Sequence, residues 1–339
     1  MTPADARRRR ILAIGLACMT ALLLAAGLAA GSDGWSPTAL WRTWNDRDGL
    51  LIVGAIRAPR TLGAWLTGAL LGLSGAVAQG LFRNPLADPY LLGSASGASL
   101  AVVLVLAASA LGGHAISIGA ADALARFGLV GAAFVGALLG VLLTLTLARG
   151  AQQTTRLLLA GVVVGVVLAA LSDLVTSAAP DALRGKQAFM LGSTGFLGWT
   201  SCAILAGGLA VALAPSWRLA RALDALTLGD DTATSLGLPL PQVRVALVGA
   251  IALATGVAVS QAGLIAFVGL AAPHLVRRFA PAAHGFSVVA SAAAGGVLLL
   301  LADVLARVLI APDEVPVGVL TALLGGSYLI WLLRRGRTP

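Results

Sequence analysis

The sequence consists almost entirely of apolar segments, each long enough or nearly long enough to cross a lipid bilayer. A spanning helix needs roughly 20 apolar residues, and ten segments approach or meet this length, the eighth being short and interrupted by Pro273. They cover residues 11–30, 62–82, 91–111, 127–148, 157–178, 196–215, 244–262, 263–279, 286–310 and 316–333. Only 11% of the 339 residues are charged, too few to cover a soluble surface of this size. The sequence predicts an all-α polytopic membrane protein with about ten transmembrane helices, forming one domain over residues 1–339.

The basic residues predict how these helices are oriented. Arg7 to Arg10 precede the first segment, and basic residues stay on the cytoplasmic side. With ten spans, 15 of the 23 basic residues fall on the side of Arg7–Arg10 and 8 on the other. We therefore expect both termini to be cytoplasmic. A cleaved signal peptide is the alternative for the first segment, but its apolar run exceeds the usual 7–15 residues or so.

The composition and motifs exclude several functions. A net charge of +9 would suggest nucleic-acid binding in a soluble protein, but here the basic residues stand at segment ends, so no nucleic acid is expected. Cys18 and Cys202 lie inside apolar runs and give neither a disulfide framework nor metal-ligand spacing. The sequence has no phosphate-binding loop and no metalloprotease or serine-hydrolase motif. We expect no enzyme, no cofactor and no metal site, and any ATP that drives transport must bind another chain.

An ion-coupled secondary transporter is the alternative of a different class. Such proteins place ionisable residues near the middle of the membrane. The only acidic residues within the ten segments are Asp173 and Asp303, both near segment ends, and Asp303 lies four residues before Arg307, as in a local ion pair. The pattern disfavours ion coupling.

Three stretches are more polar or more irregular than spanning requires. Residues 57–60 lead into the second segment, and residues 83–89 form a proline-bounded turn in which Asn84 and Asp88 can satisfy backbone groups. Residues 216–243 predict two short helices, the first ending near Gly229 and the second capped by Asp230 or Asp231. This pair offers a docking surface for a soluble partner, or else rests on lipid headgroups. Residues 261–274 predict a broken helix, in which His274 is a structural residue or part of a moving element.

Together these stretches resemble the FecCD-type permeases of ATP-binding-cassette importers, which take up iron–siderophores, haem and cobalamin. After His274 the chain departs from the pattern, reading Phe279-Ala-Pro-Ala-Ala-His284-Gly. The matching residues extend over nearly the whole chain: Arg57-x-Pro-Arg60, Ser74-Gly-Ala76, Gln79, Arg83-Asn-Pro-Leu-Ala87, Pro89, Leu92-Gly93, Arg156-Leu-Leu-Leu-Ala-Gly161, Leu228-Gly229, Leu236-Gly-Leu-Pro239, Gly263-x-Ile-x-Phe-Val-Gly-Leu270, Pro273-His274, Ala302-Asp303, Arg307 and Pro316-x-Gly-x-x-Thr321.

The resemblance implies the type II importer permease fold in the bacterial cytoplasmic (inner) membrane. Its implied partners are a second copy of the chain, two cytoplasmic ATPase subunits and an extracytoplasmic binding protein, and its breadth favours a ferric siderophore, with haem or cobalamin as alternatives. It implies that Arg57, Arg60 and Arg307 dock the binding protein and that Asn84, Leu86, Thr154 and Thr155 lie at the cytoplasmic gate. Residues 223–238 are implied as coupling helices that contact the ATPase, with Leu228, Gly229, Asp230, Asp231, Leu236 and Gly237 as the residues concerned.

Overall fold

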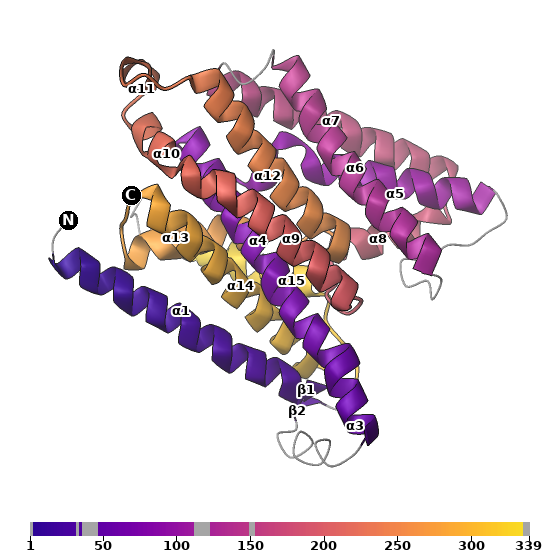
Figure 1. Cartoon of the computed structure of the whole chain (residues 1–339). Coiled ribbons are helices and arrows are strands. Elements are labelled where there is room, and N and C mark those ends of the chain that lie inside the picture. The colour runs from indigo at the N-terminus through magenta and orange to yellow at the C-terminus, as the bar shows by residue number, and fades with distance from the viewer. Residues whose placement is uncertain (1–2, 32–33, 36–46, 112–122, 149–152, 335–339) are drawn as a thin grey trace.

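The computed structural model of the chain describes residues 3–31, 34–35, 47–111, 123–148 and 153–334, which are helical along most of their length (Figure 1). Two antiparallel strands of two residues each follow the first helix. The elements are α1 (Pro3–Ala29), β1 (Ala30–Gly31), β2 (Gly34–Trp35), α3 (Arg47–Ile52), η1 (Val53–Arg57, a π-helix), α4 (Ala58–Phe82), η2 (Pro89–Leu92, a 3₁₀-helix), α5 (Ser94–Leu111), α6 (Ala123–Leu147), α7 (Thr154–Ala178), α8 (Ala182–Leu191), α9 (Trp199–Arg218), α10 (Ala220–Thr227), α11 (Asp230–Ser235), α12 (Leu240–Ala262), α13 (Val268–Phe279), α14 (His284–Val308) and α15 (Val317–Arg334).

Each of the ten predicted segments contains a helix, which confirms the all-α membrane architecture. Seven helical stretches of the described chain are long and apolar enough to span a bilayer, and α5 and α15 are shorter apolar helices. The eighth segment contains a short helix as predicted, but Pro273, the expected point of interruption, lies inside α13 and the break comes before it. Gly263 and Phe267 have positive φ angles of 70° and 68°, and only 12 residues of α13 follow them. A left-handed backbone at Phe267 interrupts any helix that would otherwise join α12 to α13.

The second span begins earlier than the sequence predicted. Helical structure is continuous from Arg47 to Phe82, so the Arg57-to-Arg60 stretch lies within a helix instead of leading into one. Pro59 does not end this helix, although proline lacks the N–H that a helix interior uses. The π-helix η1 accommodates it, since the Ala58 N–H donates to the carbonyl of Val53, five residues back.

The centre of the molecule is the pair α4 and α14, which approach each other backbone to backbone. A Cβ on Gly72 would lie 2.1 Å from the Ser291 carbonyl oxygen, and one on Gly295 would lie 2.2 Å from that of Gly68. Small residues permit this approach where lipid supplies no hydrophobic drive for helix association. The two helices therefore form one tightly packed unit.

The two ends of the bundle differ in character. Figure 1 places both chain termini at the end that carries α10 and α11, and places β1, β2 and α3 at the opposite end. We call these the α10–α11 end and the β1–β2 end. Arg149, Arg335 and Arg337, which contributed to the charge count, lie outside the described residues.

Candidate functional sites at the two ends of the bundle

A charged network is buried near the β1–β2 end, and Asp303 of α14 is its centre. The Asp303 carboxylate is fully buried and accepts hydrogen bonds from Arg60 Nε (3.2 Å), Thr194 Oγ1 (2.6 Å) and Arg307 Nη2. The ion pair between Asp303 and Arg307 that the four-residue spacing indicated is thus present. Three donors from three segments of the chain compensate the negative charge of Asp303, and these interactions offset the cost of burying its carboxylate.

Arg307 and Arg57 are both directed at the backbone that ends α1. Arg307 Nη1 donates to the Gly27 carbonyl (2.9 Å) and Nη2 to Thr61 Oγ1 (3.3 Å). Arg57 Nη1 donates to the Leu28 carbonyl (3.2 Å). Arg307 is only 3% exposed whereas Arg57 is partly exposed, so in this conformation Arg307 lies beneath the surface at which a partner would dock.

Arg60 also pairs with Glu314, an exposed residue in the loop before α15. Its Nη1 and Nη2 atoms donate to the two carboxylate oxygens of Glu314, at 2.7 and 2.8 Å, in a bidentate pair. These hydrogen bonds hold the pKa of the Glu314 carboxyl below its usual range, against the opposing effect of partial burial. Arg60 therefore bridges a buried acid, Asp303, and an exposed one.

The α10–α11 end carries the two predicted short helices, at residues 220–235 instead of 223–238. In α10, Leu223 and Leu226 are at most 1% exposed and anchor the helix to the transmembrane body. In contrast, Leu228 and Leu236 are 65% and 63% exposed and follow the two helices directly. The pair thus buries one face and presents large apolar side chains on the other.

The predicted capping of α11 by Asp230 or Asp231 is wrong. Gly229 is the N-cap, with φ 105°, and no side chain caps the helix. The Asp230 carboxylate instead pairs with Arg244 of α12 (2.6 Å) and with Arg83 at the end of α4 (3.4 Å). Asp231 is exposed in the first turn of α11 and Gly237, with φ 82°, ends the turn after it. Asp230 therefore pairs with arginines of two other helices and does not cap α11.

The predicted gate residues lie in two segments. Asn84 Oδ1 accepts from the Leu86 N–H (2.9 Å), and Asp88 Oδ1 accepts from the Tyr90 N–H (2.8 Å), so both side chains satisfy the backbone of the turn as expected. Leu86 is 51% exposed. Thr154 and Thr155 begin α7, which packs against η2, the 3₁₀-helix that follows this turn.

Sequence reasoning missed several paired residues. Thr194 and Glu314 complete the Arg60 network, Asp224 accepts hydrogen bonds from His284, and Lys186 of α8 pairs with Asp173 of α7. These pairs join residues from 13 to 254 positions apart, so no local pattern marks them. The Asp173–Lys186 pair had one signal in the sequence, which is that Lys186 is the only lysine of the chain and lies in a long apolar region.

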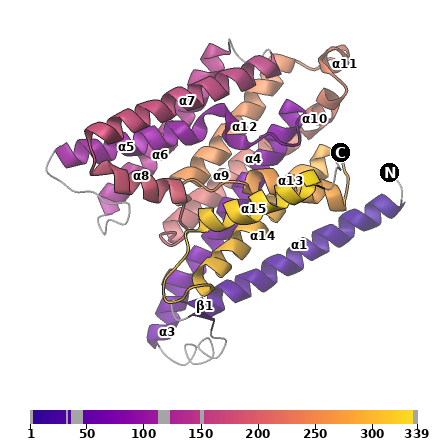
Figure 2. The same ribbon diagram turned by 180° about the vertical axis from the view of Figure 1, so that it is seen from behind.

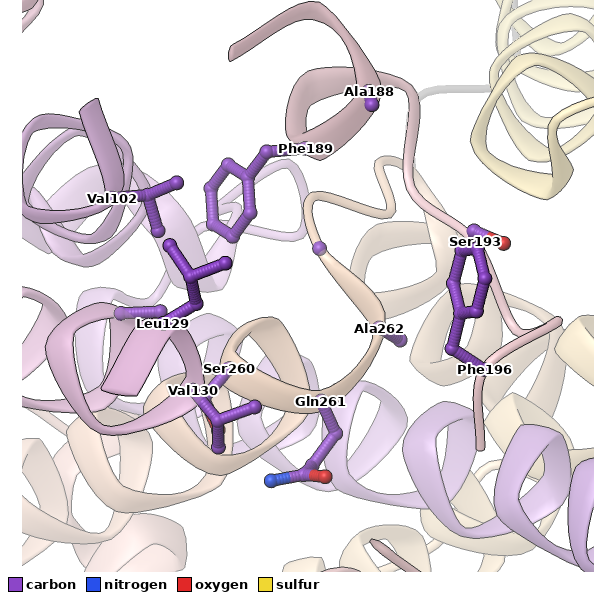
Figure 3. Close-up of a pocket in the computed structure, with 12 residues that line it drawn as sticks. Val102, Leu129, Val130, Ala188, Phe189, Ser193, Phe196, Ser260, Gln261 and Ala262 are labelled. Atoms are coloured by element: carbon purple, nitrogen blue, oxygen red, sulfur yellow. The ribbon is translucent and has the colours of Figure 1, made fainter. Parts of the chain in front are cut away.

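Four cavities within the described part of the chain have volumes of about 70, 180, 210 and 220 Å³. Figure 3 shows the smallest, which is lined by Val102, Leu129 and Phe189 on one side and has Gln261 among its other lining residues. Sites for drug-sized ligands start at roughly 300 Å³. None of these four is large enough for a metal macrocycle, and no group of three His, Cys, Asp or Glu side chains in the described residues could hold a metal ion.

Comparison with known proteins shows the family to which the chain belongs. The model of the FecCD transport family matches residues 19–335. The chain belongs to the FecCD transport family. The haemin transport system permease HmuU of Yersinia pestis is 37% identical over 329 residues, covering 96% of this chain and 93% of HmuU. The vitamin B12 import system permease BtuC of Escherichia coli O9:H4 (strain HS) is 39% identical over 329 residues, covering 95% of each chain.

Solved structures agree on the fold. A metal-chelate type ABC transporter in an inward-facing conformation matches this FecCD permease with a TM-score of 0.83 and 24% identity, covering 96% of this chain and 99% of that one. PsaBC of Streptococcus pneumoniae, in complex with a Fab, matches with a TM-score of 0.54 over 79% of this chain and 88% of that one. The chain is therefore a multi-pass permease of the ABC-importer class, as the sequence motifs indicated.

Proposed function

We propose that this chain is the membrane subunit of an importer that carries a metal chelate across the bacterial cytoplasmic membrane by alternating access. Two copies would enclose the pathway, two separate ATPase subunits would bind and hydrolyse ATP, and an extracytoplasmic binding protein would deliver the chelate. The sequence favours a ferric siderophore, whereas HmuU and BtuC are named for haemin and vitamin B12. All three ligands are bulky metal chelates that need a wide passage.

The observation that carries this proposal is the helix pair α10–α11. An exposed apolar surface is typical of a contact with another protein when its side chains form a patch. Leu228 and Leu236 have this exposure, and the buried face of α10 fixes the pair to the bundle. We assign them, with Gly229, Asp230, Asp231 and Gly237, to the ATPase contact, and hence the α10–α11 end and both termini to the cytoplasm.

The β1–β2 end is then extracytoplasmic and receives the binding protein. Guanidinium groups bind carboxylates in a bidentate geometry, which suits a partner that presents acidic side chains. Arg57 and Arg60 are the proposed contacts, and Arg307 supports Arg60 from beneath through Asp303. Asn84, Leu86, Thr154 and Thr155 are the proposed cytoplasmic gate, since they lie in the turn after α4 and at the start of α7.

Uptake into liposomes tests the proposal. The chain is reconstituted with its ATPase and binding protein and given labelled haem, cobalamin or ferric siderophore in separate reactions. We expect ATP-dependent uptake of one chelate. Replacing Leu228 and Leu236 together by Ser should abolish both ATPase association and uptake, because the apolar contact is lost.

Thr232→Ala is the matched control, since Thr232 is exposed on α11 but polar, and it should leave uptake unchanged. Uptake driven by a proton gradient with no ATPase present would contradict the proposal and favour the ion-coupled secondary transporter.

A further inference from the structure

A carboxylate from α10 caps the first turn of α14. Asp224 Oδ1 accepts the backbone N–H of His284 (2.9 Å) and also lies 2.6 Å from the Nδ1 atom of its ring. The first N–H groups of a helix have no acceptor within that helix. The residue that precedes α14, Ala283, has no side-chain acceptor, so Asp224 supplies one from another helix. The start of α14 is thus tied to the position of α10.

This contact is enclosed by a third helix. A Cβ on Gly80, near the end of α4, would lie 2.8 Å from His284 Nε2 and 3.2 Å from Leu223 Cδ2. The adjacent Leu223 is fully buried, whereas the side chains of His284 and Asp224 are 20% and 39% exposed, so the contact is half-buried. An exposed ion pair between flexible side chains contributes little. The enclosure by α4, α10 and α14 makes this contact more rigid than such a pair.

From this contact α14 extends across the bundle to the charged network at the β1–β2 end. Its 25 residues span about 37 Å at 1.5 Å per residue. Asp303 and Arg307, near its far end, bind Arg60 and the end of α1. Because Gly72 and Gly295 hold α14 against α4 at backbone distance, neither helix can shift along the other without a clash. Figure 1 shows α14 beside α4, with α10 near one end of the pair.

We propose that Asp224 and His284 are positioning residues that transmit movement of α10–α11 to the α4–α14 pair, and through it to the Arg60 network. This inference rests on the proposed function, because it requires an ATPase that moves α10–α11. Each half of the connection is a contact of the described structure: a shared carboxylate at one end and the buried Asp303 network at the other. The Asp224–His284 contact is where the helix pair and the rigid unit meet.

The test measures ATP hydrolysed and chelate imported by the same liposomes, containing the chain with its ATPase and binding protein. Asp224→Ala removes both hydrogen bonds and His284→Leu removes only the one to the ring. We expect hydrolysis to continue while uptake per ATP falls about fivefold or more in Asp224→Ala and less in His284→Leu. His284→Gln keeps a side-chain donor and should restore uptake per ATP. Asp181→Ala, an exposed acid that precedes α8 and lies outside the proposed ATPase contact, is the matched control and should behave as the unaltered chain.

A purely structural contact would give a different result, with hydrolysis and uptake falling by the same factor as less complex assembles. That result would overturn the inference, as would an unchanged uptake per ATP. If Asp224→Ala does not fold, Asp224→Asn, which still accepts the backbone N–H, replaces it with the same expected direction. Absence of ATP-driven uptake by the unaltered chain would refute the proposed function as well, whereas failure confined to the variants would refute this inference alone.

Discussion

Asp303 and Glu314 hold the same arginine, yet they differ in what surrounds them. Asp303 is fully buried and bound by Arg60, Thr194 and Arg307, whereas the side chain of Glu314 is 41% exposed and bound by Arg60. Removing one partner from a buried charge cluster leaves the others uncompensated, while water replaces a lost partner at the surface. The two acids should therefore have separable roles, one in stability and one at the docking surface.

Paired substitutions test this separation. Asp303→Asn should lower the free energy of unfolding by about 3 kcal/mol, because two guanidinium groups lose their buried counter-charge. Glu314→Gln should lower it by less than about 1 kcal/mol. Denaturant unfolding of the purified chain in detergent measures both. Equal losses in the two variants would show that burial does not distinguish them.

The Arg60–Glu314 pair also predicts a dependence on pH. The pKa of the Glu314 carboxyl is lowered in the folded chain, so its ionised form is the one that folding stabilises. This contribution is present above the ordinary glutamate pKa and is lost as the pH falls through the lowered folded value. Thermal unfolding between pH 6 and roughly pH 3 should show a loss of stability that is smaller in Glu314→Gln. An identical loss in both proteins would contradict the assignment.

The α4–α14 contact depends on glycines at which a side chain would clash, whereas some glycines of other helices have open space around them. Gly72 lies against the Ser291 carbonyl, whereas Gly207 of α9 has no atom within 4 Å of the place where a Cβ would be. Both are mid-helix glycines, so their intrinsic cost to helix formation is the same. Only the packing differs.

Alanine substitutions separate these two effects. Gly72→Ala should destabilise the chain by about 1–3 kcal/mol, because the helices must move apart. Gly207→Ala should be neutral or stabilise it by up to about 1 kcal/mol through helix propensity. The midpoint of denaturant unfolding in detergent reports both changes. A neutral Gly72→Ala would show that α4 and α14 are not held at backbone distance, and would weaken the proposed transmission along them.

The presence of the helices could be predicted from the sequence, but their exact ends and the partners of their charged residues could not. Each of the ten apolar runs contains a helix, and seven helical stretches of the described chain are long and apolar enough to span a bilayer. The start of the second span was placed too late, because the π-turn that accommodates Pro59 has no sequence signal. Asp230 was assigned to capping because local rules place an acid there, while Arg83 and Arg244 come from other helices.

For the molecule as a whole, we predict that the face that carries α7, α8 and α15 contacts the proposed second copy. Figure 2 shows α7 and α15 on the same face, with α8 between them. α7 exposes apolar side chains along most of its length, among them Val166 at 65%. None of the four cavities within the described part of the chain is large enough for a metal chelate. Their small size is consistent with a pathway that lies between two copies.

Cysteine cross-linking in native membranes tests this arrangement. In a Cys18→Ser background, which removes the exposed native thiol, Val166→Cys should give a covalent dimer on oxidation. Val211→Cys of α9 is the matched control at 62% exposure and should remain a monomer, because we expect lipid to cover it. Dimer formation by neither variant, or by both equally, would contradict an interface along α7.

Composition and motif order were enough to determine that this chain is a membrane permease of the importer class, because the length of apolar segments and the positions of prolines, glycines and arginines are local properties. Tertiary structure alone decided which charges meet. Asp303 with Arg60, Asp224 with His284 and Asp230 with Arg83 come from helices far apart in sequence, and a helix rotation of a single residue would separate them. A direct ion pair requires its nitrogen and oxygen atoms to lie within about 4 Å of each other, so only the packed bundle specifies the partners.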